Sequence, residues 1–153
     1  MKSIVRTDSS NPDFRGLVAL LDQYLGELDG PEHSFYAQYN KLDAIQHVVV
    51  GYADGVPAAC GAFKFWEEGT VEIKRMFTHP DFRRQGWAEV VLGELERWAS
   101  AEGFPRAVLE TGHRQQEAVR LYERLGYGRI PNYGQYAGVA NSICMAKALS
   151  SAS

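Results

Sequence analysis

The pattern that most constrains the fold lies between residues 70 and 111. An apolar run over residues 70–78 is typical of a strand, residues 88–103 carry apolar side chains at helical spacing, and residues 106–111 form a second compact apolar run. A strand-helix-strand unit of this length implies a parallel pair with a right-handed crossover. The pattern therefore predicts an α/β fold.

Two further strands lead into this unit. Residues 46–53 and 56–66 are β-rich and are separated by Asp54-Gly55, the strongest short hairpin signal. A turn at residues 67–69 then leads into the 70–78 strand. Three strands thus meander before the crossover, and residues 3–7 are predicted to add a short first strand.

The helices and the end of the chain follow from capping and spacing. Asn11 and Pro12 open a helix, which ends at Asp29-Gly30-Pro31. Its predicted apolar stripe is Leu17, Leu20, Leu21, Tyr24 and Leu28. A short helix is predicted around Phe35, Tyr36 and Tyr39, another helix at residues 118–125, a loop at 130–141 and a last strand at 142–149. We expect a mixed sheet with helices on both faces, in a single domain over residues 1–149 with a short tail at 150–153.

Composition narrows the function classes. With 153 residues, 45% hydrophobic and 23% charged, the chain reads as an ordinary globular protein. It has no membrane-spanning run, and its start lacks the apolar core of a signal peptide, so we expect a cytoplasmic protein with no membrane partner. Cys60 and Cys144 fall in predicted strands and are expected to be buried. The four histidines show no metal-ligand spacing, so no metal site is predicted. The net charge of −3 argues against nucleic-acid binding, with a local exception at Lys74, Arg75, Arg83 and Arg84.

A basic loop lies where the 70–78 strand meets the following helix. It reads Arg83-Arg84-Gln85-Gly86-Trp87-Ala88. A helix N-terminus offers unsatisfied N–H groups and the positive end of the macrodipole, and a glycine lets a phosphate approach the backbone closely. The loop lacks the lysine-serine ending of a P-loop and the G-x-G-x-x-G of a dinucleotide fold. It is therefore predicted to bind an anion in another way.

Two motifs resemble those of the GNAT N-acetyltransferases. Arg83, Gly86 and Ala88 match the family's acyl-CoA-binding signature Q/R-x-x-G-x-G/A, and residues 118–127 resemble its second motif, A-x-x-L-Y-x-x-x-G-Y/F. Residues 71–78 look like the family's central strand. The resemblance spans residues 71–127 and implies the acyl-CoA N-acyltransferase fold, a mixed and centrally splayed sheet of about six or seven strands.

The resemblance also implies where acetyl-CoA binds. The pantetheine arm would pair with the backbone of Met76, Phe77 and Thr78. The pyrophosphate would rest on the basic loop, whose cofactor-binding residues would be Arg83, Arg84, Gln85, Gly86, Trp87 and Ala88. Gln115 is also expected to bind the coenzyme, but many family members carry asparagine at this position, so the resemblance does not establish its side-chain contact.

The same resemblance and the chemistry of acyl transfer suggest catalytic residues. The backbone N–H of Met76 would face the thioester carbonyl, where an oxyanion develops. A protonated amine must lose a proton before it attacks, and Glu72 is the first candidate for the base, on the argument that it shares strand parity with Met76. Its alternative is an exposed strand carboxylate paired with Lys74 or a neighbour. Glu110 is the second candidate for the base, and its alternative is a carboxylate that fixes the fold. Tyr122 is predicted to donate a proton or hydrogen bond to the departing thiolate, the alternative being a core position.

These inferences predict an enzyme that acetylates a primary amine of a small molecule or peptide by direct attack in a ternary complex. The aromatic residues expected around the acceptor are Tyr36, Tyr39, Trp66, Tyr133 and Tyr136. The alternative is a non-catalytic CoA-binding sensor or partner-binding module. The resemblance also makes a homodimer possible. No motif in the sequence identifies the acceptor amine.

Overall fold

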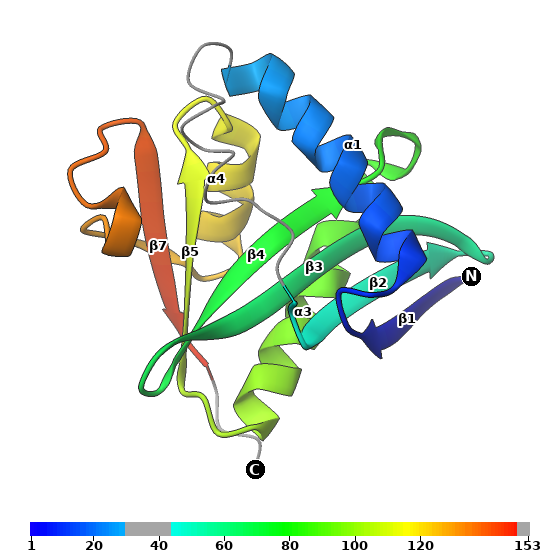
Figure 1. Ribbon diagram of the computed structural model, residues 1–153, viewed down its shortest axis with the longest axis horizontal. Helices are drawn as coiled ribbons and strands as arrows, with labels where there is room; N and C mark the ends of the chain where they lie inside the picture. The colour runs from blue at the N-terminus through cyan, green and yellow to red at the C-terminus, as the bar shows by residue number, and fades with distance from the viewer. Residues whose placement is uncertain (30–43, 150–153) are drawn as a thin grey trace.

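One mixed sheet organises the protein. The computed structural model describes residues 1–29 and 44–149, which form a seven-stranded sheet in the order β1-β2-β3-β4-β5-β7-β6 (Figure 1). The strands are β1 (Lys2–Thr7), β2 (His47–Ala53), β3 (Val56–Glu67), β4 (Thr70–Thr78), β5 (Arg106–Gly112), β6 (Gly128–Ile130) and β7 (Ser142–Ala148). The helices are α1 (Pro12–Asp29), α3 (Trp87–Ala101) and α4 (Gln116–Arg124), with 3₁₀ turns η2 (Pro80–Phe82) and η3 (Gly134–Tyr136). In these described ranges, no helix is both long enough and apolar enough to cross a membrane.

Local chemistry explains the first elements. The Asn11 side chain accepts hydrogen bonds from the backbone N–H groups of Asp13 and Phe14, at 2.9 and 3.0 Å, and so caps α1 as predicted. Asp54 and Gly55 both have positive φ angles, 48° and 84°, which is the conformation of a two-residue type I′ hairpin turn. The β2–β3 hairpin is therefore confirmed at the predicted turn.

Helices cover both faces of the sheet and give it two cores. On one face α1 packs its buried residues Phe14, Leu17, Val18 and Leu21 against β2, β3 and β4. On the other face lie α3 and α4, whose buried residues join a larger core around Val71 and Ile73 (Figure 1). The predicted stripe of α1 was partly wrong, because Leu20 and Tyr24 are exposed.

The centre of the sheet splays where its one parallel pair ends. β4 and β5 pair only from Thr70↔Arg106 to Glu72↔Val108. β4 then diverges from β5, as Figure 1 shows. Residues 73–78 consequently have no β5 partner in the described sheet, and the backbone on that edge of β4 is available to a ligand.

A β-bulge interrupts β4 at the same place. The register runs from Ala62↔Lys74 to Cys60↔Phe77, so three steps in β4 oppose two in β3. Arg75 takes up the extra residue with a φ of 61°, a conformation rare for a non-glycine residue. The bulge changes which face each later side chain of β4 occupies.

The C-terminal part differs from its predicted layout. The predicted loop at residues 130–141 begins inside β6 and contains η3. β7 lies between β5 and β6, so the last strand in the sequence is internal to the sheet. The helix predicted around residues 35–39 lies outside the described residues.

Candidate active site

The β4 bulge corrects the parity argument for Glu72 and Met76. Because of the extra residue at Arg75, the Met76 side chain turns to the α3 face, where a Cβ on Gly61 would lie 2.5 Å from its Sδ. Glu72 lies on the opposite face, which it shares with Lys74. The prediction that Glu72 and Met76 share a face was therefore wrong.

A large groove runs along the open edge of β4. Its volume is about 810 Å³, and it is bordered by the end of β4, the basic loop and α4. Every residue predicted to bind the cofactor, except Gln85, lines it: Met76, Phe77, Thr78, Arg83, Arg84, Gly86, Trp87, Ala88, Gln115 and Tyr122. The groove is large enough for an extended ligand such as a pantetheine chain.

The basic loop has the backbone geometry of an anion site at the start of α3. Arg84 and Gly86 have φ angles of 64° and 82°, and Gly86 is the N-cap residue. The Lys2 side chain donates a hydrogen bond to the backbone carbonyl of Gln85 and so braces the loop from β1. The Trp87 side chain is buried, with its ring against Gly51, so only its backbone can face an anion.

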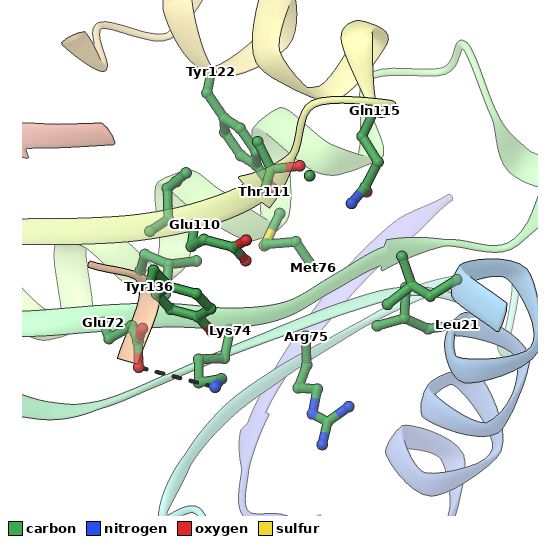
Figure 2. A pocket seen from close by; sticks show the side chains of 14 residues that line it. Leu21, Glu72, Lys74, Arg75, Met76, Glu110, Thr111, Gln115, Tyr122 and Tyr136 are labelled. Carbon is green, nitrogen blue, oxygen red and sulfur yellow. Dashed lines mark ion pairs between the residues drawn. The ribbon is translucent and has the colours of Figure 1, made fainter. Parts of the chain in front are cut away.

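A smaller pocket opens from the groove between β4 and β5. Its volume is about 100 Å³. The two cavities share four lining residues, Leu21, Met76, Gln115 and Tyr122. Figure 2 shows Tyr122 from α4, Glu110 from β5 and Met76 from β4 converging on this junction. A ligand in the groove and a second ligand in the pocket would therefore meet near Met76.

Two carboxylates line the small pocket from neighbouring strands. The pairing Glu72↔Val108 puts those residues on one face of the sheet, and Glu110 shares that face because it follows Val108 by two. Glu72 is only 2% exposed. Its Oε2 accepts a hydrogen bond of 2.6 Å from the Tyr133 hydroxyl, and its Oε1 lies 4.0 Å from the Lys74 ammonium. Glu72 is thus buried and not exposed as its alternative interpretation had it, although the ion pair with Lys74 in that interpretation is present.

Tyr122 occupies the wall between the two cavities. Its side chain is 8% exposed and packs edge-on against Tyr127, with ring centroids 5.9 Å apart. Burial raises the pKa of the Tyr122 hydroxyl. The hydroxyl therefore stays protonated at neutral pH and can act as a donor, even though the ring belongs to the core.

The predicted basic cluster is divided in the structure. Arg83 and Arg84 lie on the loop, whereas Lys74 and Arg75 are largely buried in β4 and line the small pocket. Arg75 donates to the Asp22 carboxylate at 3.2 Å, which ties β4 to α1. Burial lowers the pKa of Lys74, and the nearby Glu72 opposes that shift. The four cations therefore do not form one cluster, because the bulge holds Lys74 and Arg75 in the sheet.

The aromatic residues expected around the acceptor take different positions. Tyr136 lines the small pocket directly. Tyr133 lies behind it on Glu72, and Trp66 packs edge-on against Tyr133 at 5.0 Å. Tyr36 and Tyr39 fall outside the described residues. Sequence reasoning did not assign Lys2, Leu21 or Arg75 to the site, although Leu21 was placed in the α1 stripe and Arg75 in the basic cluster.

Comparison with known proteins agrees with this geometry. The model of the acetyltransferase (GNAT) family matches residues 12–127. The IAA acetyltransferase of Azospirillum brasilense is 31% identical over 135 residues, which cover 87% of this chain and 88% of that protein.

Solved structures share the fold. A protein of Klebsiella pneumoniae assigned as an acyl-CoA N-acyltransferase superposes with a TM-score of 0.82 at 28% identity, covering 98% of this chain and 99% of the other. The PaiA N-acetyltransferase of Thermoplasma acidophilum, in complex with coenzyme A, gives a TM-score of 0.70 at 13% identity over 97% and 99% of the two chains. These similarities confirm the expected family resemblance and the splayed mixed sheet.

Proposed function

The chain belongs to the acetyltransferase (GNAT) family, and from that premise we propose that it transfers an acetyl group from acetyl-CoA to a primary amine. The amine would belong to a small molecule or a peptide and would attack directly in a ternary complex. The observation that carries this proposal is the junction of the two cavities at Met76 and Tyr122. The groove would hold the coenzyme and the small pocket the acceptor.

The coenzyme is assigned to the groove by its shape and charge. The pyrophosphate would rest on the backbone of the basic loop at Gly86, near the charges of Arg83 and Arg84. The pantetheine arm would pair with the unpaired edge of β4 through Met76, Phe77 and Thr78. The structure of the Thermoplasma acidophilum relative with coenzyme A supports this choice of cosubstrate.

The proposed reaction makes one bond and breaks one. The amine nitrogen attacks the thioester carbonyl carbon, the N–C bond forms, and the C–S bond breaks to release the coenzyme thiolate. The backbone N–H of Met76 would stabilise the oxyanion, a contribution of roughly 3 kcal/mol for one such donor. The Tyr122 hydroxyl would donate to the departing sulfur.

The amine proton would pass to a carboxylate of the small pocket. Glu72 is our first candidate and Glu110 the second. Glu72 precedes Met76 by four residues, a separation of up to about 13 Å along a strand, so it would act through water and not by direct contact. A cavity of about 100 Å³ has room for such water. Glu110 lies two positions farther along the shared face, toward the end of β5, and lines the same pocket as Met76.

Turnover of acetyl-CoA with a panel of amines tests this proposal. The sequence carries no motif that identifies the acceptor, so the panel should span polyamines, amino acids, aminoglycosides and peptides. We expect thiol release that depends on one class of amine. Tight acetyl-CoA binding without turnover on any amine would instead support a coenzyme sensor.

A further inference from the structure

We propose that Tyr133 is a positioning residue for the reaction, which fixes the Glu72 carboxylate so that one of its oxygens is left to accept the proton. This inference rests on the proposed function, and on Glu72 as the base. Tyr133 lies on the segment between β6 and β7, 61 residues from Glu72 in the sequence. It does not line either cavity, so it would act through Glu72 and not on a substrate.

The hydrogen bond from Tyr133 gives the two carboxylate oxygens of Glu72 different environments. The Tyr133 hydroxyl donates to Oε2 at 2.6 Å, a length typical of a hydrogen bond to an ionised carboxylate. Oε1 is buried and has no hydrogen-bond partner among the described residues, with the Lys74 ammonium 4.0 Å away. A buried oxygen without a partner is costly in a purely structural carboxylate. The arrangement is what a base requires, because one oxygen is anchored and the other can take a proton.

The Tyr133 ring is itself held on two sides. Trp66 at the end of β3 packs edge-on at 5.0 Å, and Tyr136 packs edge-on at 5.7 Å. Gly134, with a φ of 53°, lets Trp66 approach, since a Cβ there would lie 2.3 Å from the indole. These contacts fix the ring, so the hydroxyl has little freedom to leave Glu72.

Burial keeps Tyr133 in the donor form. Burial raises the pKa of the Tyr133 hydroxyl, and the negative charge of Glu72 raises it further. The hydroxyl therefore donates to the carboxylate across the working pH range. The other titratable groups around Glu72 come from five elements: Lys64 on β3, Lys74 on β4, Glu110 on β5, Cys144 on β7 and Tyr136 on η3.

The test is the variant Tyr133→Phe, which removes the hydroxyl and keeps the ring. We expect kcat to fall about tenfold, a fraction of the hundredfold or more that a general base contributes, while the acetyl-CoA Kd is unchanged. The acid limb of the kcat/KM profile should move to higher pH, because the lost donor favoured the ionised carboxylate. Both enzymes are measured with the same acceptor amine, so the titration of the amine contributes equally to the two pH profiles.

Two comparisons separate positioning from a structural role. Tyr52→Phe removes a hydroxyl that donates to Asp13 at 2.7 Å, outside both cavities, and should leave kcat and the acid limb unchanged. The double variant of Glu72→Gln and Tyr133→Phe should be no slower than Glu72→Gln alone, because Tyr133 acts through Glu72. Thermal unfolding and acetyl-CoA titration report whether each variant is folded.

The outcomes are distinct. An unchanged acid limb in Tyr133→Phe, or effects of the two substitutions that multiply, would overturn the role of Tyr133 while leaving Glu72 as the base. A Glu72→Gln enzyme with its full rate at neutral pH would overturn the base assignment, and this inference with it. If Tyr133→Phe does not fold, Trp66→Leu removes the ring that supports Tyr133 and should move the acid limb in the same direction. An unchanged limb there would count against the proposal.

Discussion

The backbone of Gly51 in β2 lies directly against the Trp87 indole at the start of α3. A Cβ on Gly51 would come within 2.5 Å of one ring carbon and 2.8 Å of another. The ring is rigid and buried, so it has little room to move. This contact joins the sheet to the first residue after Gly86, and therefore to the loop assigned to the coenzyme.

Gly51→Ala should both destabilise the protein and weaken acetyl-CoA binding. Overpacking against a fixed ring typically costs about 1–3 kcal/mol, and displacement of Trp87 would move the basic loop. Thermal unfolding and calorimetric titration measure the two effects. Gly16→Ala in α1 is the control: no atom of residues 1–29 or 44–149 lies within 4 Å of its Cβ position, and the substitution should raise stability by about 0.5–1 kcal/mol. Unchanged stability in Gly51→Ala would show that the Trp87 indole can move aside to accommodate the new methyl group.

Gly86→Asp is expected to raise the Kd for acetyl-CoA at least about tenfold, or 1.4 kcal/mol. It puts a negative charge where the pyrophosphate would rest. Because Gly86 has a φ of 82°, any side chain there is also strained. Gly103→Asp, at a φ of 95° and with open space around it, carries the same strain away from the groove. Equal losses of affinity for acetyl-CoA in the two variants would contradict the assignment of the basic loop to the pyrophosphate.

Tyr122→Phe should lower kcat about tenfold or more while changing the KM for acetyl-CoA little. The hydroxyl is proposed to act on the departing sulfur, an interaction made mainly in the transition state. Steady-state kinetics under conditions where chemistry limits turnover provide the measurement. An unaltered kcat would leave Tyr122 as a packing residue of the core beside Tyr127.

Glu72→Gln should cut kcat/KM at neutral pH about a hundredfold and leave the acetyl-CoA Kd nearly intact. Glutamine keeps the size of the side chain but cannot accept the amine proton, so activity should partly recover at high pH, where free amine is abundant. The pH profile of kcat/KM reports this.

Glu110→Gln is the matched variant for that measurement, because Glu110 lines the same pocket on the same face of the sheet. A loss confined to Glu110→Gln would transfer the role of base to Glu110. Full activity in both variants would mean that another group or bulk water takes the proton.

The two cysteines should resist thiol reagents in the folded protein. Burial raises the pKa of Cys60 to about 12 and that of Cys144 to about 11. At pH 8 the thiolate fractions are then only about 10⁻⁴ and 10⁻³, and at pH 9 they are still only about 10⁻³ and 10⁻². Labelling with a disulfide reagent should therefore be slow until urea unfolds the protein. Rapid labelling of either cysteine in the native state at pH 8 would contradict the burial of that side chain.

The sequence alone determined the features that depend on neighbours along the chain. The Asn11 cap, the Asp54-Gly55 hairpin and the strand-helix-strand unit are local patterns, and the structure confirms each. The two motifs likewise identified the family. The residues proposed for the coenzyme could be predicted because most of them follow one another between β4 and α3.

Only the tertiary structure decided the arrangement inside the pocket. The bulge at Arg75 breaks the two-residue period on which the parity of Glu72 and Met76 was argued, and no local signal announces it. The insertion of β7 between β5 and β6 brings the Tyr133 segment onto Glu72. Such contacts join residues far apart in the chain, and their geometry depends on how whole strands and helices pack. Spacing along the sequence therefore indicates which residues the site uses, whereas packing decides which of them meet.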